Sequence, residues 1–283
     1  MNKNPLLTYD NLEVSYGGCS VVREVSFEVK GGEIFGIVGE SGSGKSTILR
    51  ATLGLLGGSG AITGGQIRYE ASNLGRSNLE VSNLGTSNLC EFPPGVMREI
   101  RGAEIGMIFQ DCLSALSPTR TVESQLWEAC CAHEGLSYGR EELFERACVL
   151  LEKLSVDQPE RVLRSYPFEL SGGLGQRVGI AMAMLLEPKV ILADEPTSAL
   201  DVISQRQVLD ALRRLCDEQG VSIVFVSHNI AAVRAIANSV LVLKDGVVEE
   251  AGNAQEVLSN PQTPYTKKLL SSVVSLKGES AYE

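Results

Sequence analysis

The chain has 283 residues, about twice a common domain length of roughly 150, which allows one large domain or a core domain with a smaller partner. Hydrophobic residues make up 43% and charged residues 21%, which excludes a mainly disordered or collagen-like polymer. The 35 acidic residues exceed the 25 Lys and Arg, so the formal charge of -10 argues against nonspecific binding to nucleic acid or anionic lipid. The sequence has no apolar run near ~18 residues and no signal-peptide core, so we expect a soluble, non-secreted chain.

Short apolar runs separated by glycine-rich turns fill the N-terminal part. Residues 12–16, 20–30 and 34–39 have the composition of strands, and a glycine-rich loop leads from the third into residues 46–56, which have helical spacing. The order strand, loop, helix is typical of an α/β unit.

The segment 111–170 repeats apolar residues at three and four positions, which predicts helices. After it, residues 190–194 and 222–227 resemble buried strands followed by helices, and Lys244, Asp245 and Gly246 resemble a hairpin turn. The alternation predicts a mostly parallel sheet interrupted by a helical subdomain.

Residues 71–90 consist of four pentapeptides with Ser-Asn-Leu at their centre. A period of five places the leucines on neither one helix face nor one strand face. The pattern is similar to the pentapeptide-repeat solenoid, but four copies would form a single coil with no neighbour to stack on. We therefore favour an expanded surface loop, with the solenoid as the alternative.

The seven cysteines are an odd number and form no CxxC pair, so reduced thiols are favoured over disulfides or a zinc site.

A phosphate-binding loop is the strongest local signal. Residues 39–47 match GxxxxGK[ST] between a strand and a helix. Backbone N–H groups of such a loop and the helix N-terminus bind phosphate oxygens, Lys45 adds charge at the β- and γ-phosphates, and the Ser46 hydroxyl can ligate magnesium. The nucleotide-binding residues predicted in this loop are Gly39, Ser41, Gly42, Gly44, Lys45, Ser46 and Thr47.

Two carboxylates end the apolar strand at 190–194. Ligands of open α/β sheets bind at the carboxyl ends of strands. We expect Asp194 to hold magnesium and Glu195 to orient and activate the attacking water. Alone, this pair could be a helix cap; together with the phosphate loop it indicates a nucleoside triphosphatase that uses ATP and Mg²⁺.

A third motif, 170–177, places Ser171, Gly172 and Gly173 at the start of an apolar helix, where an anion could bind or where the serine is only a cap. With this motif, the order of elements resembles the ATP-binding cassette (ABC) family, whose signature is LSGGQ or a close variant. The resemblance implies an α/β P-loop NTPase with a mostly parallel core, an N-terminal antiparallel β-subdomain and a helical signature subdomain.

The resemblance also implies a domain plan, a single nucleotide-binding domain over 1–283. Its core and β-subdomain are expected in 1–110 and 171–250, its helical subdomain in 111–170, the repeat as a loop insertion at 71–90, and a tail at 251–283.

Further site residues follow from the same resemblance. Tyr16 matches an aromatic that stacks on adenine, although it could also be a strand residue facing the core. Gln110 matches a glutamine that contacts magnesium and the attacking water, and His228 matches a histidine at the γ-phosphate. Asp201 belongs to the loop that crosses between two nucleotide domains.

In this family, two nucleotide domains bind ATP head to tail, so the resemblance implies a second subunit, identical or paralogous, whose phosphate loop faces Ser171. Residues 100–118, 164–202 and 260–270 resemble the peptide and nickel importer branch, although Cys112, Ser117, Leu174 and Gly175 depart from its pattern, Ser117 standing where asparagine is usual. No cysteine follows Cys216, so we expect no C-terminal iron–sulfur cluster of the kind some members of the branch carry.

The sequence thus predicts an ATPase subunit of an importer for peptides, nickel or a related small solute. Its partners would be integral membrane permease subunits and, indirectly, an extracytoplasmic solute-binding protein, with no nucleic acid, and it would lie on the cytoplasmic face of the inner membrane. The alternatives are an accessory subunit of a soluble enzyme complex of the phosphonate-breakdown type and a non-transport cassette ATPase.

Overall fold

The computed structural model describes residues 5–70, 86–133, 138–198 and 200–271. Its strands are β1 Pro5–Tyr16, β2 Cys19–Lys30, β3 Ile34–Val38, β4 Gly60–Glu70, β5 Thr86–Asn88, β6 Ile105–Ile108, β7 Val190–Asp194, β8 Ser222–Ser227, β9 Ser239–Lys244 and β10 Val247–Asn253. Its helices are α1 Lys45–Thr52, α2 Pro94–Ile100, α3 Val122–Cys131, α4 Arg140–Lys153, α5 Pro159–Arg164, α6 Gly172–Met184, α7 Val202–Gln219, α8 Ile230–Ile236, α9 Ala254–Ser259 and α10 Pro264–Ser271, with 3₁₀ turns η2 Leu89–Glu91 and η3 Pro167–Glu169.

A six-stranded sheet in the order β10-β9-β3-β8-β7-β6 forms the centre, and all neighbouring pairs in it are parallel except β10 with β9. The inner strands β3, β7 and β8 are buried at every position because both faces of the sheet are covered. In β7, Val190 and Leu192 join the hydrophobic core on one face, whereas Ile191 and Ala193 join the core on the other.

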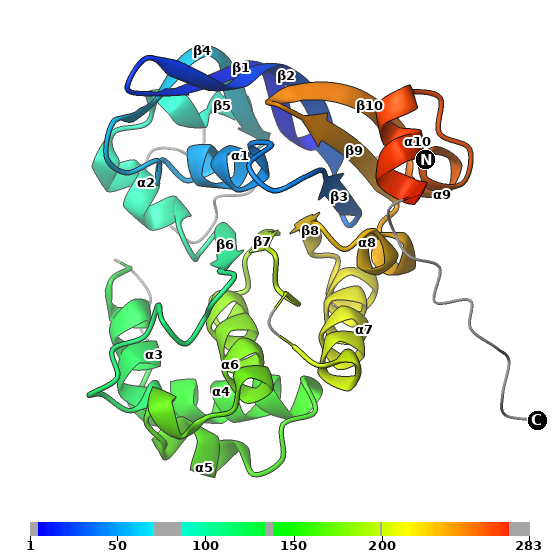
Figure 1. Ribbon diagram of the computed structural model, residues 1–283. Helices are drawn as coiled ribbons and strands as arrows, with labels where there is room; N and C mark the ends of the chain where they lie inside the picture. Colours follow the sequence, from blue (N-terminus) through cyan, green and yellow to red (C-terminus); the bar gives the residue numbers. More distant parts are fainter. Residues whose placement is uncertain (1–4, 71–85, 134–137, 199, 272–283) are drawn as a thin grey trace, which may run out of the picture.

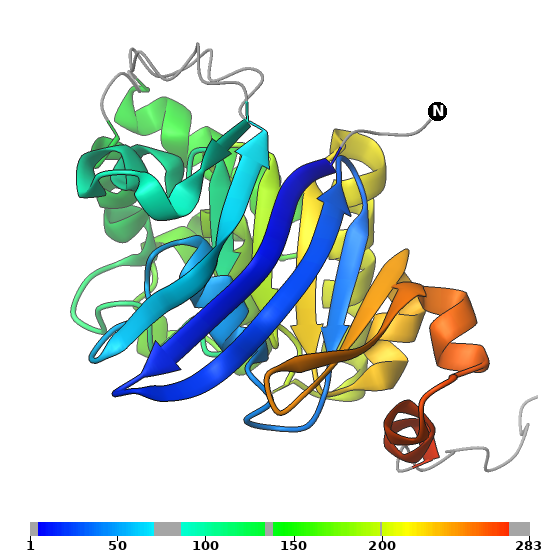
Figure 2. The same cartoon turned by 90° about the horizontal axis from the view of Figure 1, so that it is seen from above.

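A four-stranded antiparallel sheet, β2-β1-β4-β5, covers one face of the central sheet together with α1 (Figures 1 and 2). Three stacked rings connect the two sheets: the Tyr9 and Phe27 centroids are 4.1 Å apart, and Phe27 and Phe35 are 4.9 Å apart. The predicted α/β class with an N-terminal antiparallel sheet is confirmed.

Helices cover the other face of the central sheet (Figure 1). The segment 111–170 contains α3, α4, α5 and η3, and α6, which begins after this segment, packs against α4. The helical layer therefore extends past residue 170 into the signature helix.

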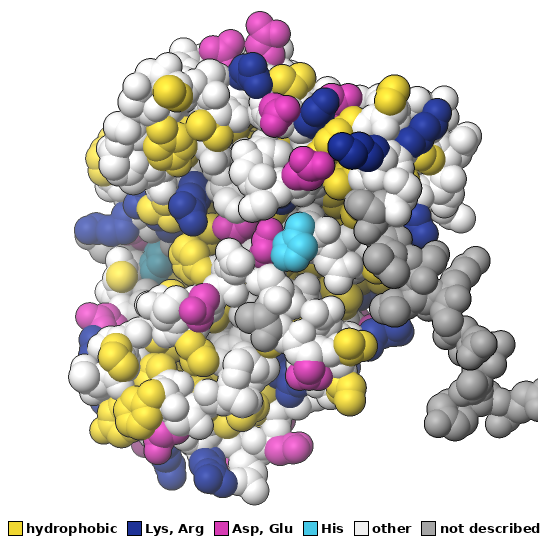
Figure 3. All heavy atoms as spheres, in the orientation of Figure 1, with side chains coloured by type: hydrophobic (Ala, Val, Ile, Leu, Met, Phe, Trp, Pro, Cys, Tyr) yellow, Lys and Arg dark blue, Asp and Glu magenta, His cyan; other side chains and the backbone are white. Residues whose placement is uncertain are grey.

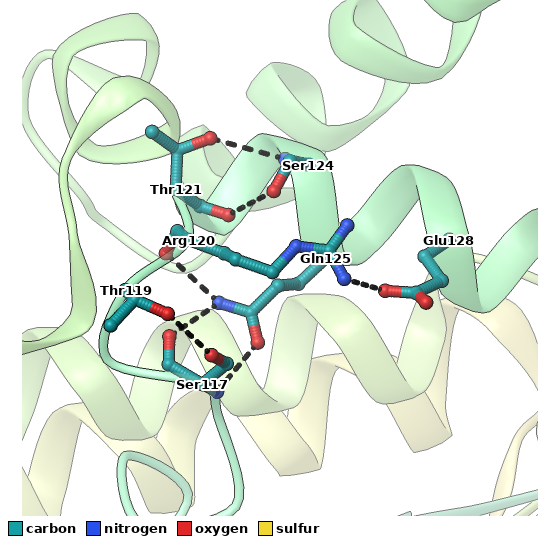
Figure 4. Close-up of polar contacts among 7 residues, drawn as sticks. All are labelled: Ser117, Thr119, Arg120, Thr121, Ser124, Gln125 and Glu128. Atoms are coloured by element: carbon teal, nitrogen blue, oxygen red, sulfur yellow. Dashed lines mark hydrogen bonds and ion pairs between the residues drawn. The ribbon is translucent and has the colours of Figure 1, made fainter.

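The turn that leads into α3 is held by Gln125 (Figure 4). Its amide oxygen accepts the N–H of Ser117 at 2.7 Å, and its amide nitrogen donates to the Ser117 carbonyl at 3.0 Å and the Arg120 carbonyl at 3.1 Å. Thr121 caps the helix by accepting the N–H of Ser124 at 3.4 Å. Because Gln125 binds the backbone of Ser117, these contacts do not depend on the side chain at position 117.

The structure describes parts of two segments of the expected domain plan. The fourth pentapeptide of the repeat begins with β5, where Asn88 pairs with Arg68, and Leu89 is buried in the core. The other three copies lie outside the described residues. The tail predicted from residue 251 is folded up to Ser271, because β10 continues to Asn253, which caps α9, and α10 follows. The buried face of α9, formed by Ala254, Val257 and Leu258, holds this polar segment against the core.

Candidate functional site

The candidate site lies where four neighbouring parallel strands end. The phosphate loop follows β3, Gln110 follows β6, Asp194 and Glu195 end β7, and His228 follows β8. Because the carboxyl ends of parallel strands meet at one edge, residues from four distant segments converge there.

Lys45 is the first residue of α1 and is only 4% exposed. Its Nζ donates to the carbonyls of Glu40 at 2.8 Å and Gly39 at 3.0 Å, and it lies 3.5 Å from Ser43 Oγ. Burial lowers the pKa of Lys45, and the Glu195 and Asp194 carboxylates oppose that shift. A buried ammonium at a helix N-terminus is a strong attractor for phosphate.

Ser46 and Asp194 form a pair of hard oxygen donors. The Ser46 hydroxyl donates to Asp194 Oδ1 at 2.7 Å. Burial raises the pKa of Asp194, whereas the Ser46 hydrogen bond and the positive charges of Arg50 and Lys45 oppose the shift. Hydroxyl and carboxylate oxygens are ligands that Mg²⁺ prefers. The two residues fit a magnesium site.

Two hydrogen-bonding side chains contact the same carboxylate oxygen of Glu195. The Gln110 amide nitrogen lies 3.4 Å and His228 Nδ1 lies 3.0 Å from Glu195 Oε2. The backbone of Glu195 has φ +47 and donates its N–H to the Val226 carbonyl at 3.0 Å. The His228 side chain is 57% exposed, and a histidine stands beside acidic side chains between the upper and lower halves of the molecule in Figure 3. The carboxylate is thus oriented at an accessible edge.

The signature residues form a second cluster. Ser171 caps α6 by accepting the N–H of Leu174 at 3.4 Å, and α6 begins with Gly172. Asp201 caps α7, accepting the N–H groups of Ile203 and Ser204 at 3.0 Å each. The two helix starts are adjacent, because a Cβ on Gly173 would lie 3.1 Å from Ser204 Oγ. None of the contacts among the described residues joins this cluster to the phosphate loop of the same chain.

Gly175, which departs from the family pattern, has a local explanation. A Cβ at this position would come within 2.3 to 2.6 Å of three side-chain atoms of Leu113. Leu113 therefore occupies the space that a larger residue at 175 would need, and the start of α6 is still capped normally by Ser171.

Tyr16 lies at the end of β1, paired with Gly60 of β4, and is half-buried against the N-terminal core. None of its contacts in the described residues reaches the phosphate loop, so the adenine-stacking role remains a prediction.

Sequence reasoning missed the contact between Glu40, inside the phosphate loop, and Tyr265 of α10. Glu40 provides one of the carbonyls that hold Lys45, and its N–H donates to the Tyr265 hydroxyl oxygen at 3.4 Å. The C-terminal segment around Tyr265 is recognisable as typical of the importer branch, but nothing in the sequence places it next to a loop 225 positions earlier.

A phosphate loop, an apolar strand ending in two carboxylates and a separately capped Ser-Gly-Gly helix together define an ATP-binding cassette. The ABC transporter family matches residues 22–198, and the chain belongs to it. The described residues contain no helix with the length and apolar character needed to cross a membrane.

Several known proteins are similar to this chain. A dipeptide transport ATP-binding protein, DppD of Bacillus subtilis (strain 168), is 39% identical over 276 residues, covering 96% of this chain and 77% of that protein. An oligopeptide transport ATP-binding protein, OppD of Salmonella typhimurium (strain LT2), is 38% identical over 282 residues, covering 98% and 79%. The cassette MJ0796, solved as a dimer in a post-hydrolysis state with ADP and Pi, superposes with a TM-score of 0.72 at 28% identity, covering 88% of this chain and 98% of that one. The predicted family and the main function, an ATP-binding subunit of a transporter, are confirmed.

Proposed function

We propose that this chain hydrolyses ATP with Mg²⁺ as one half of a cassette dimer, and that hydrolysis drives solute import through separate membrane subunits. The observation that carries the proposal is the convergence of Lys45, the Ser46–Asp194 pair and Glu195 at one sheet edge. Similarity to dipeptide and oligopeptide transport proteins favours a peptide over nickel as the solute.

In this proposal each residue of the catalytic edge has its own role. Lys45 and the start of α1 would bind the phosphates, and Ser46 and Asp194 would hold Mg²⁺, which would neutralise charge on the transferring phosphate. Gln110 would contact the magnesium and the attacking water. Glu195, whose Oε2 is contacted by Gln110 and His228, would accept a proton from that water as its oxygen bonds to the γ-phosphorus and the bond from that phosphorus to ADP breaks. His228 adds a donor near the γ-phosphate.

The remaining site residues serve binding in this proposal. Tyr16 would stack on the adenine, and the other loop residues would supply N–H groups to the phosphates. Ser171, Gly172, Gly173 and Asp201 would complete the site of a second subunit, identical or paralogous. Next to Asp201, Val202 is 81% and Ile203 72% exposed, so a contiguous apolar surface adjoins the signature cluster.

An apolar cavity of about 340 Å³ opens next to Gln110, between β6, α3 and α6. Its lining includes Phe109, Leu116, Leu126 and Met182, and Phe109 is 41% exposed. We assign a short cytoplasmic helix of a permease subunit to this cavity, since Phe109 directly precedes Gln110 and a ligand here could affect the catalytic edge. In this proposal the chain would lie on the cytoplasmic face of the inner membrane, and an extracytoplasmic solute-binding protein would be an indirect partner.

The test combines two variants with matched controls. Lys45→Ala should abolish ATP binding and turnover, whereas Glu195→Gln should keep binding but stop hydrolysis. Lys153→Ala on α4 and Glu218→Gln on α7 remove the same kinds of charge from exposed helix positions and should behave like the wild type. Undiminished ATPase activity of Lys45→Ala and Glu195→Gln, assembled with their partners, would reject the site.

Copurification tests the transport role separately. Recovery of the chain with integral membrane subunits supports an importer, whereas recovery with a soluble enzyme core supports the accessory alternative.

A further inference from the structure

The phosphate loop is contacted from outside by the C-terminal part of the chain. The Tyr265 hydroxyl oxygen, on α10, accepts the Glu40 N–H at 3.4 Å. The carbonyl of the same residue, Glu40, accepts Lys45 Nζ at 2.8 Å. One residue of the loop therefore connects α10 to the lysine that binds phosphate. Burial raises the pKa of Tyr265, so its oxygen accepts this hydrogen bond as part of a neutral hydroxyl.

Helix α10 is anchored firmly enough to position a side chain. The Glu250 carboxylate on β10 accepts the N–H groups of Gln262 at 3.0 Å and Thr263 at 3.3 Å, directly before the helix. Thr263 Oγ1 accepts the N–H of Thr266 at 3.2 Å, and Thr266 is fully buried. The start of α10 is thus fixed to the strand that closes the central sheet, and Figure 2 shows α10 beyond this edge.

The β9–β10 turn supports the same part of the loop. Its Gly246 donates its N–H to the carbonyl of Ser43 at 3.0 Å. The ammonium of Lys244 lies 5.0 Å from the centre of the Tyr265 ring and 3.8 Å from Glu249, so the ring is held over the turn. Tyr265 and Gly246 together fix two backbone positions of the phosphate loop, Glu40 and Ser43.

We propose that Tyr265 is a positioning residue for nucleotide binding: by accepting the Glu40 N–H, it holds the first turn of the phosphate loop in the conformation that presents Lys45. This inference rests on the proposed ATP site. A loop whose backbone is fixed before binding loses less conformational freedom when phosphate arrives, so the contact raises nucleotide affinity. Tyr265 does not touch the reacting atoms, so the chemical step at saturating ATP is unaffected.

The test is Tyr265→Phe in the full-length chain, since phenylalanine keeps the ring over Lys244 and removes only the acceptor. The affinity for a fluorescent ATP analogue with Mg²⁺ should weaken about three- to tenfold, the range for loss of one hydrogen bond. The KM for ATP should rise by a similar factor with kcat unchanged, and the melting temperature of the ligand-free protein should not move. Tyr138→Phe is the matched control, because the Tyr138 ring lies under Arg146 in the helical layer, and it should bind like the wild type.

Three outcomes overturn the proposal. The first is an affinity of Tyr265→Phe within experimental error of the wild type, and the second is an equal loss in Tyr138→Phe. The third is a lower melting temperature with unchanged affinity, which would make Tyr265 a stabilising residue only. Lys45→Ala in the same series separates the proposed ATP site from the proposed role of Tyr265. If Lys45→Ala loses ATP binding while Tyr265→Phe does not, the ATP site is supported and the role of Tyr265 is rejected. If the wild type itself does not bind, the proposed function fails.

Discussion

Replacing Gly246 by alanine adds a single methyl group, but we expect it to destabilise the protein strongly. Gly246 has φ +80, a left-handed conformation that costs an alanine about 1 to 2 kcal/mol. Its new Cβ would also lie 2.1 Å from the Val21 carbonyl oxygen and 2.9 Å from the Val21 carbonyl carbon. These are backbone atoms of a paired strand and cannot rotate away, so overpacking adds about 1 to 3 kcal/mol. We expect a total loss of about 2 to 5 kcal/mol in the free energy of unfolding.

Thermal denaturation of the full-length chain measures this loss, which corresponds to a fall of very roughly 5 to 15 °C in melting temperature. Gly220→Ala is the matched control, since Gly220 ends α7 with φ +69 and a Cβ there would meet no atom within 4 Å. Gly220→Ala should therefore lose only the free energy that a left-handed conformation costs an alanine, without any steric overlap. Equal losses in the two variants would refute the steric argument. ATP affinity of Gly246→Ala should also fall, because the displaced turn no longer donates to Ser43.

Two further predictions concern the helical layer. Gly175→Ala should destabilise the wild type, because its new Cβ would collide with Leu113. In a Leu113→Ala background the same change should stabilise the protein by up to about 1 kcal/mol, because the space is free and only the higher helix propensity of alanine remains. Urea unfolding measures both effects, and the same sign in the two backgrounds would contradict the argument. Burial lowers the pKa of His133, although Glu99 opposes the shift. The unfolded state therefore binds more protons below its pKa of about 6.5, and the free energy of unfolding should fall as pH drops through that value. In His133→Gln this part of the pH dependence should be absent, and an unchanged profile would show that other groups cause it.

The sequence predicts those residues of the site that belong to one short motif or that directly follow an apolar strand. Lys45 and Ser46 belong to one short motif, and Asp194 and Glu195 end a strand whose burial is evident from its composition. Because the carboxyl ends of parallel strands meet at one edge of the sheet, these residues are expected to lie together even when the strand order is not known. The hydrogen bond between Ser46 and Asp194 at 2.7 Å meets that expectation.

The remainder depends on contacts that no local pattern encodes. Glycine is an unfavourable residue inside a helix, and only the contact with Leu113 explains Gly175. The segment expected to be a tail contains α9 and α10, where Leu258 is buried and Glu250 anchors the second helix. Tertiary contacts decided both positions, and a single sequence does not reveal them.

The pairing of Glu70 with Thr86 has a practical consequence. These two residues are register partners on adjacent strands, so the two ends of the segment that joins them are fixed at neighbouring positions. Closing a longer excursion between fixed ends costs only about 0.6 kcal/mol per doubling of length. The junction therefore tolerates insertions of different size without a shift of β5 along β4, and it offers a graft point for an affinity tag or a fluorescent domain.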